Sequence, residues 1–413
     1  MKRRVVVTGL GAISPLGLTI DELWVNLLDG RSGVGPITRF DATDFPTRIA
    51  AEIKGYDPLN YLEKKDVRHL DLSHQYGLAA TADALKDAGL NNDNIEPNRT
   101  GAILGSAHGG AITHDEQYSL MLDKGVRFLS PSRMTMIHSD MAPSLIAIKY
   151  GLRASNYSVS AACASGTIAI GGAFHAIRNN EADVMITGGT DSDVHAFALA
   201  GFSRLKAIST RNDEPEEASR PFDKDRDGFI VAEGAGIIIL EELEHAVKRN
   251  AKIYAEVIGY GTSCDGYHWT APEPTGEAAA LSIEMAIRDA GIKPEDVDYI
   301  NTHGTATGLG DPAETKAIKK ALGEHAYKVT LNSSKSMLGH LMGGAGGIEA
   351  LITCLSIRDS KIHPTMNLDN PDPECDLDYS ANKITEKEIN IAMSDSFGFG
   401  GHNAIVVLKK YEQ

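Results

Sequence analysis

The chain has 413 residues, of which 42% are hydrophobic and 23% charged, and its formal net charge is −16. This content allows a large core, while the negative charge disfavours nucleic acid and anionic membrane as partners. The first residues lack the apolar run of a signal peptide, and no apolar stretch of about 18 residues predicts a membrane span. The four cysteines have no CxxC spacing, which favours reduced thiols and a cytoplasmic protein over a disulfide framework.

Short apolar runs ending in glycine alternate with helical patterns, which predicts an α/β fold. Similar segments recur in the same order in the two parts of the chain. The predicted strands form three such pairs: 4–11 with 254–261, 101–105 with 297–300, and 157–160 with 328–331. Two helices also match, and each ends in a glycine, Gly89 or Gly291, where a left-handed C-cap is expected. We therefore predict two related halves, 1–250 and 251–413, packed as one body.

A candidate nucleophile, Cys163, lies between a short apolar strand and a helical pattern, in the sequence Ser-Val-Ser-Ala-Ala-Cys-Ala-Ser-Gly. The small neighbours leave room for a bulky acyl group. A cysteine in such a strand-to-helix turn lies at the positive end of the helix dipole, which favours the thiolate. An isolated cysteine is more often a small buried core residue, but the other three cysteines lack this setting.

Two histidines follow predicted strands of the second half. His303 lies in Asn-Thr-His-Gly-Thr, and His340 follows Met-Leu-Gly and precedes a glycine-rich helix start. Parallel sheets gather functional residues at the carboxyl ends of their strands, so we expect these rings to share a cleft. Most of the 14 histidines should be structural, and one histidine beside a cysteine would suit a hydrolase. Two neutral imidazoles suit a different task, the donation of hydrogen bonds to one developing enolate oxygen.

These motifs, with Val-Val-Thr-Gly-Leu-Gly at 6–11 and Ser-Phe-Gly-Phe-Gly-Gly-His-Asn at 396–403, resemble the β-ketoacyl-acyl carrier protein synthases of the KAS I/II type. The resemblance runs nearly end to end. It implies a thiolase-like fold, with two related halves packed as layered α-β-α-β-α. It also implies an acyltransferase of fatty acid elongation, in which an acyl group on Cys163 condenses with a decarboxylating malonyl-carrier thioester. No cofactor or metal is expected, since the substrates are carried on phosphopantetheine.

Further roles follow from the resemblance alone. His303 and His340 would bind the malonyl carbonyl. The pair Lys335 and Glu349 would order the site, and Phe399 would act as a gate whose backbone N–H helps to hold the oxyanion. Thr305 and Thr307 would contact the pantetheine arm, and Phe202 would form a wall of the acyl pocket. The carrier-binding surface would include Lys65, Arg68 and Lys206. Each surface cation could equally be a solvated charge. The implied partners are an acyl carrier protein and a second subunit, in a homodimer or in a heterodimer with a related chain.

Several positions depart from the family pattern. His108 stands where an apolar residue or glycine forms the floor of the acyl pocket, and the segment 138–141 is more polar than the usual pocket wall. Asp395 replaces an asparagine, and His402 replaces a threonine. A polar ring on the pocket floor disfavours a long alkyl chain because the ring would lose its hydration. Unless these changes are neutral, they leave open a specialised type II polyketide or polyene ketosynthase, while the intact Cys163 argues against a non-catalytic partner subunit.

Overall fold

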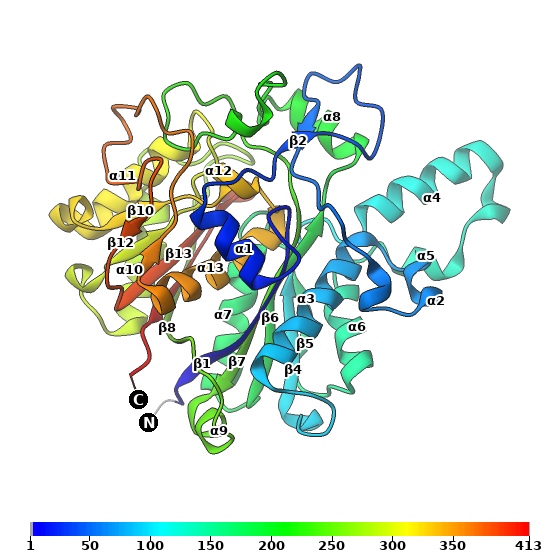
Figure 1. The fold of residues 1–413 in the computed structure, drawn as a ribbon, viewed down its shortest axis with the longest axis horizontal. Helices are drawn as coiled ribbons and strands as arrows, with labels where there is room; N and C mark the ends of the chain where they lie inside the picture. Colours follow the sequence, from blue (N-terminus) through cyan, green and yellow to red (C-terminus); the bar gives the residue numbers. More distant parts are fainter. Residues whose placement is uncertain (1–2, 413) are drawn as a thin grey trace.

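The computed structural model describes residues 3–412, and its centre is one mixed sheet of ten strands with helices on its faces (Figure 1). The strands of this sheet are β1 (Val5–Ile13), β4 (Thr100–Gly105), β5 (Asn156–Val159), β6 (Val184–Ser192), β7 (Glu233–Glu242), β8 (Ala255–Cys264), β9 (Tyr299–Asn301), β10 (Thr330–Asn332), β13 (Ile391–Gly398) and β14 (His402–Lys409). Two short pairs lie outside it: β2 (Gly35–Pro36) with β3 (Ile49–Ala50), and β11 (Lys361–Ile362) with β12 (Thr385–Glu386).

The α-helices vary from single turns to long amphipathic segments. They are α1 (Ile20–Leu28), α2 (Lys64–Val67), α3 (Leu72–Ala88), α4 (Ala111–Lys124), α5 (Pro131–Thr135), α6 (Met141–Tyr150), α7 (Ser165–Arg178), α8 (Ala196–Arg204), α9 (Leu243–Lys248), α10 (Glu277–Ala290), α11 (Gly310–Leu322), α12 (Lys335–Leu338) and α13 (Ala345–Asp359). Within residues 3–412, no helix combines the length and apolarity needed to cross a bilayer.

The strand order repeats between the two parts of the chain. One half of the sheet runs β5-β4-β6-β7-β1 and the other runs β10-β9-β13-β14-β8, so each follows the order third, second, fourth, fifth, first. In both halves the first two pairings are parallel and the last two are antiparallel. The halves join where residues 5–7 of β1 pair with residues 255–257 of β8. The sheet therefore consists of two related five-stranded units.

The helices form three layers around these units. α3 packs on β1, β6 and β7, and α10 packs on β8 and β14. α7 and α13 contact each other and strands of both halves, so they form the central layer. Every residue of α13 from Ala345 to Ile357 is buried, as a helix covered on two sides requires. A Cβ on Gly166 would lie 2.8 Å from the backbone nitrogen of Gly347, so the close approach of these two helices needs glycine.

This arrangement is the predicted α-β-α-β-α layering. The two predicted helix ends also match, because Gly89 and Gly291 cap α3 and α10 in the left-handed conformation, each with φ of 68°. The paired strands and caps show that glycine placement and apolar periodicity were sufficient to detect the duplication.

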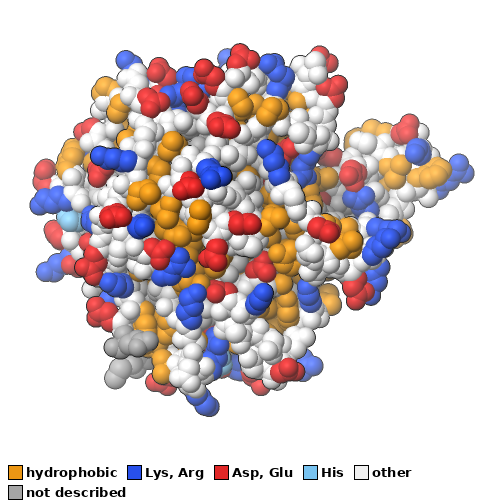
Figure 2. Space-filling view, viewed as in Figure 1, with side chains coloured by type: hydrophobic (Ala, Val, Ile, Leu, Met, Phe, Trp, Pro, Cys, Tyr) orange, Lys and Arg blue, Asp and Glu red, His pale blue; other side chains and the backbone are white. Residues whose placement is uncertain are grey.

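An arm formed by α4 and α5 projects from the body of the first half, on the right in Figure 1. Apolar side chains on this arm reach the surface, as Figure 2 shows in orange. The large exposed ones are Tyr118, Leu122, Val126, Phe128 and Met134. A cluster of this kind on a projecting segment is typical of a surface that contacts another chain.

Candidate active site

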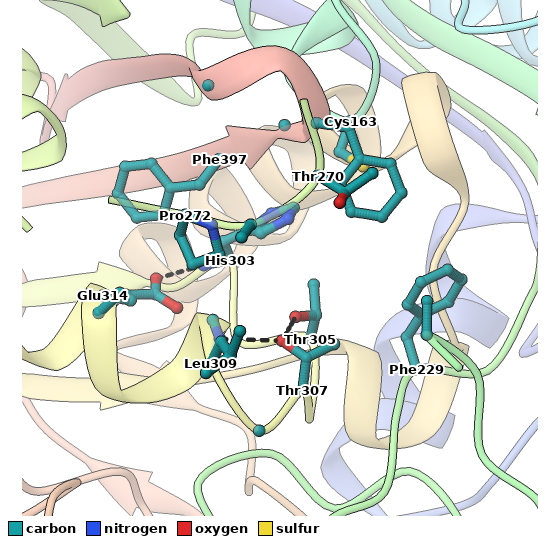
Figure 3. Close-up of a pocket in the computed structure, with 18 of the residues that line it drawn as sticks. Cys163, Phe229, Thr270, Pro272, His303, Thr305, Thr307, Leu309, Glu314 and Phe397 are labelled. Atoms are coloured by element: carbon teal, nitrogen blue, oxygen red, sulfur yellow. Dashed lines mark hydrogen bonds between the residues drawn. The ribbon is translucent and has the colours of Figure 1, made fainter. Parts of the chain in front are cut away.

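The structure brings together the three residues that the sequence singled out as catalytic. Cys163 lies in the turn between β5 and α7, His303 follows β9, and His340 follows α12. One ligand-type atom from each side chain lies within 4.8 Å of the others, and all three residues are buried. They line a cavity of about 410 Å³, which Figure 3 shows with Cys163 at one end.

The turn that carries Cys163 is unusual. Ala162 has φ of 48°, a left-handed conformation that a non-glycine residue adopts at a cost and that recurs at functional sites. The hydroxyl of Ser165 holds this turn, because it accepts from the backbone N–H of Ala161 at 2.8 Å and donates to the carbonyl of Ala162 at 2.6 Å. The turn thereby directs the sulfur into the cavity just before α7 begins.

Burial raises the pKa of the Cys163 thiol to about 11, although the positive charge of Lys335 lowers it. The backbone N–H groups of Phe399 and of Cys163 itself also lower the pKa by hydrogen bonding to the sulfur. The local N–H groups thus act in the direction that the sequence analysis expected of the helix terminus, but desolvation outweighs them and the net pKa is raised. The same two N–H groups are placed to hold an oxygen that becomes negative beside the sulfur.

A carboxyl group that the sequence did not single out fixes the His303 loop. The side chain of Glu314, in α11, accepts hydrogen bonds from the backbone N–H groups of His303 at 2.7 Å and Gly304 at 2.8 Å. Burial raises the pKa of Glu314 to about 8. The available signal was that Glu314 shares a helix face with Ala317 and Ile318, where an acidic side chain is costly unless it has a role.

Both imidazoles of the site are neutral. Burial holds the pKa of His303 and of His340 well below the usual range, and the charge of Lys335 lowers both further. The rings meet edge to face with centroids 5.3 Å apart. Nδ1 of His303 and both ring nitrogens of His340 have no hydrogen-bond partner among the described residues. Buried polar atoms of this kind are expected to find their partner in a bound substrate.

Cysteine and histidine are also zinc ligands, so the same three atoms raise the question of a metal. The buried ammonium of Lys335 is close enough to lower the pKa of the thiol and of both imidazoles. The same positive charge opposes a divalent cation at this point. The site thus fits a developing anion better than a metal ion.

Lys335 and Glu349 form a hydrogen-bonded ion pair, with side chains 2% and 1% exposed, and the charge of Lys335 acts on Cys163, His303 and His340. Lys335 begins α12 and Glu349 lies in α13, so the pair links the His340 loop to the central layer. Burial raises the pKa of Glu349 to about 7, and Lys335 opposes this shift. The pair therefore places a positive charge next to the site together with the counter-charge that offsets its burial.

The remaining predicted residues fall into two groups. Phe399, Thr305, Thr307 and Lys206 line the same cavity as Cys163, and the two threonine hydroxyls lie 3.1 Å apart (Figure 3). Four others lie outside its lining. Phe202 and His108 line a second cavity, where their rings are in contact, and the Phe202 ring also contacts Phe229. Lys65 and Arg68 are exposed on or beside α2.

Asp395 is a fully buried carboxyl whose two oxygens lack a hydrogen-bond partner among the described residues. Burial, with the nearby charges of Glu314 and Glu349, raises the pKa of Asp395 well above its usual range. The folded chain therefore holds a proton that the unfolded chain releases above about pH 4. Stability must then fall as the pH rises from that value toward the folded pKa.

Replacement of Asp395 by asparagine is expected to raise the free energy of unfolding by about 1–3 kcal/mol at alkaline pH, because an amide has no proton to lose and can donate toward the neighbouring carboxyls. The gain should be larger near pH 8.5 than near pH 5.5. Urea unfolding at both values measures it, with the exposed Asp93→Asn as the control. A variant less stable than the parent at the higher pH would contradict an unpartnered, neutral Asp395.

Comparison with known proteins gives this geometry its context. Residues 2–246 match the family model described as "Beta-ketoacyl synthase, N-terminal domain", and residues 254–369 match the family model described as "Beta-ketoacyl synthase, C-terminal domain". The chain belongs to the beta-ketoacyl synthase family. This membership confirms the family that the sequence motifs indicated.

Individual members of the beta-ketoacyl synthase family match over their whole length. The 3-oxoacyl-[acyl-carrier-protein] synthase 2 of Synechocystis sp. is 48% identical over 411 residues, which cover 100% of this chain and 99% of that protein. The protein of the same name from Coxiella burnetii is 48% identical and covers 99% of each chain. Among solved structures, the ishigamide ketosynthase/chain length factor has a TM-score of 0.94 at 35% identity, with 100% of both chains covered. A type II polyketide ketosynthase in complex with its acyl-carrier protein has a TM-score of 0.92 at 34% identity, again with 100% coverage.

Proposed function

We propose that this chain catalyses the decarboxylative condensation of an acyl thioester, held on Cys163, with malonyl-acyl carrier protein in fatty acid elongation. The observation that carries the proposal is the meeting of one thiol and two neutral imidazoles within 4.8 Å in a buried cavity. A hydrolase would need one histidine as a base beside the thiol. Two imidazoles with unpartnered nitrogens instead suit an enolate oxygen, whose negative charge each can stabilise through an N–H.

The reaction then has three steps. The sulfur of Cys163 attacks the acyl-carrier thioester, and the carrier leaves as a free thiol while the acyl group moves to Cys163. Malonyl-carrier binds next, its terminal C–C bond breaks, and carbon dioxide leaves while the bonding electrons form an enolate between His303 and His340. The enolate carbon attacks the acyl-Cys163 carbonyl, whose oxyanion lies between the N–H groups of Cys163 and Phe399. Collapse of this intermediate breaks the C–S bond to form the 3-oxoacyl-carrier product, and Cys163 leaves as a thiolate that takes a proton from water.

Contacts along the cavity suit a substrate on a long flexible arm. Thr305 and Thr307 line the cavity and offer hydroxyl groups to the amides of phosphopantetheine, and Lys206 is exposed at its mouth. Arg68 is exposed beside α2 and adds positive charge that an acidic carrier protein would approach, whereas Lys65 is paired with Glu63 at 2.8 Å. No cofactor enters this scheme, because the carrier thioesters supply all the reacting atoms.

Two exposed features of the first half support the proposal of a dimer. The apolar side chains of the α4–α5 arm need cover, and the edge strand β5 has exposed residues at Asn156 and Tyr157 that leave its outer side open to another strand. We therefore propose a homodimer, with a heterodimer of related chains as the alternative. The 48% identity to two proteins named 3-oxoacyl-[acyl-carrier-protein] synthase 2, against 34% to the type II polyketide ketosynthase and 35% to the ishigamide ketosynthase/chain length factor, favours elongation as the main function.

The assignment predicts that the two half-reactions separate in histidine variants. His303→Ala and His340→Ala should each lower carbon dioxide release from malonyl-carrier by about a hundredfold or more, because each removes a donor to the enolate oxygen. Loading of Cys163 from an acyl-carrier should fall far less. Labelled carbon dioxide and intact-protein mass spectrometry measure the two steps. Equal losses in both steps would contradict the enolate role and point to a histidine that acts only as a base for the thiol.

A further inference from the structure

A second cavity, of about 550 Å³, lies beside the catalytic one, and Leu205 lines both. Its walls come from the segments that follow β4, β6 and α5 and from α4 and α8. Apolar residues form part of the lining, but four histidines and two aspartates also face it: His108, His114, His138, His195, Asp115 and Asp193. A cavity for a plain hydrocarbon chain would bury such groups at a cost, so their presence calls for a ligand that uses them.

Two close histidine–carboxylate pairs organise this lining, beside a longer contact of 3.5 Å between Nδ1 of His114 and Oδ1 of Asp115. Nδ1 of His108 lies 3.0 Å from Oδ1 of Asp193, and Nδ1 of His195 lies 2.6 Å from Oδ2 of Asp115. Nε2 of His195 lies 4.0 Å from the same Asp193 oxygen, so Asp193 stands between the two rings. The Asp193 side chain is 1% exposed, whereas that of His108 is 46% exposed on the cavity side. The carboxylate is thus part of the wall, and the imidazole is the group that a ligand meets.

The pairing fixes what His108 can offer. The hydrogen bond to Asp193 raises the pKa of His108 to about 9, although burial opposes it. The ring is therefore cationic near neutral pH, with Nδ1–H committed to Asp193. Its second nitrogen, Nε2–H, makes no hydrogen bond to any described residue and remains as a charged donor on the cavity side. Such a donor recognises an oxygen acceptor and is poorly matched to methylene groups.

Metal binding is a weaker explanation of the cluster. Among the described residues, the only three side chains of the ligating type whose atoms approach one another within 4.8 Å are Cys163, His303 and His340. The second cavity therefore has no converged set of three ligands. Its histidines are arranged as separate donors along a wall.

Contacts place this cavity behind the nucleophile. Ser160, three residues before Cys163, donates to the carbonyl of Ala107, the neighbour of His108, at 3.3 Å. On the other side, the Phe202 ring contacts His108 at 6.4 Å and Phe229 at 5.5 Å, and the Phe229 ring contacts His340 at 5.3 Å. An acyl chain attached to Cys163 that passes Phe202 thus arrives at His108.

We propose that the second cavity receives the far end of the acyl primer and selects chains that carry an oxygen acceptor there, a hydroxyl, oxo or carboxylate group, through the Nε2–H of His108. Asp193 positions His108 and keeps its ring turned to the cavity. This inference rests on the proposed condensing function, because the chain must first be attached to Cys163. Within that function, it predicts a preference for acyl groups with an oxygen at the far end over fully reduced ones.

The test compares loading of Cys163 by acyl-carriers of equal length whose far end is a methyl, hydroxyl, oxo or carboxylate group, followed by intact-protein mass spectrometry. The native chain should load the best oxygenated primer about tenfold faster or more than the methyl-ended one. His108→Ile should abolish or invert this ratio. His108→Ile with Asp193→Asn avoids a buried unpaired carboxylate and should behave alike, so a folding defect cannot explain the result. The three oxygenated primers show which acceptor is preferred.

His245→Ile is the matched control, since His245 also pairs with a carboxylate, Glu241 at 2.8 Å, but lies outside both cavities. It should retain the native ratio. Equal loading of methyl-ended and oxygenated primers by the native chain, or an oxygen preference that survives both His108 variants, would overturn the proposal. Acetyl-carrier, whose acyl group is too short to reach His108, separates failure of the oxygen preference from failure of the condensing function. Condensation with acetyl-carrier without any oxygen preference refutes this inference alone. No condensation with any primer refutes the proposed function.

Discussion

Replacement of Cys163 by serine will lower condensation by about a thousandfold or more, because a hydroxyl is a far weaker nucleophile than a thiol and no positioned base compensates. Both nearby imidazoles have a depressed pKa and are aligned for an oxygen of the substrate, so neither is suited to take a serine proton. The acyl-enzyme should also be absent from the mass spectrum of Cys163→Ser incubated with acyl-carrier.

The chain offers a matched control in Cys264→Ser, since Cys264 is exposed and does not line the catalytic cavity. That variant should load acyl groups and condense at the native rate. Condensation by Cys163→Ser at close to the native rate would end the assignment of Cys163 as nucleophile. Loss of acyl loading in Cys264→Ser would show that the acyl group is attached to Cys264 and not to Cys163.

Replacement of Lys335 by methionine should lower the free energy of unfolding by about 3–5 kcal/mol, because it leaves Glu349 buried without its counter-charge. Burial already raises the pKa of Glu349 to about 7, and loss of Lys335 raises it further. An acid whose pKa is raised by folding loses stability as the pH climbs above its unfolded value. The deficit of Lys335→Met should therefore grow between about pH 5.5 and about pH 8.5 in urea unfolding.

The double variant Lys335→Met with Glu349→Gln should recover most of this loss, since no buried charge remains. Activity should not recover. The positive charge of Lys335 lowers the pKa of the Cys163 thiol, so without it the thiolate becomes scarcer. A double variant that condenses at the native rate would show that the pair serves stability alone. A single variant as stable as the parent at both pH values would contradict a buried, paired Glu349.

Much of the catalytic site could be predicted from the sequence, because its members follow strands. Cys163 follows β5 and His303 follows β9, and apolar runs that end in small polar loops mark such positions. Glu314 was missed because its role depends on how α11 lies against the His303 loop, which no local pattern encodes. The net pKa of Cys163 could not be predicted from the sequence, because burial is set by the whole fold and outweighs the local helix terminus.

The second cavity shows the same division. His108 stood out as a polar residue on a predicted pocket floor, but its partner Asp193 did not. The two meet because β4 and β6 are parallel neighbours in the sheet, although their segments are far apart along the chain. Strand order of this kind depends on long-range pairing, so periodicity can propose strands without fixing which ones lie together.

The repeated strand order gives each reactive position a counterpart in the other half. His303 follows the second strand of its half and His340 follows the third, and the same places in the first half belong to His108 and Cys163. An ancestral duplication would thus have produced two equivalent sheet edges, and the first half contributes the nucleophile and the wall of the second cavity. The residue proposed to select the substrate, His108, and the imidazole of His303 thus lie at equivalent positions of different halves. Selection could therefore alter His108 and its surroundings without changing the imidazoles that carry the reaction.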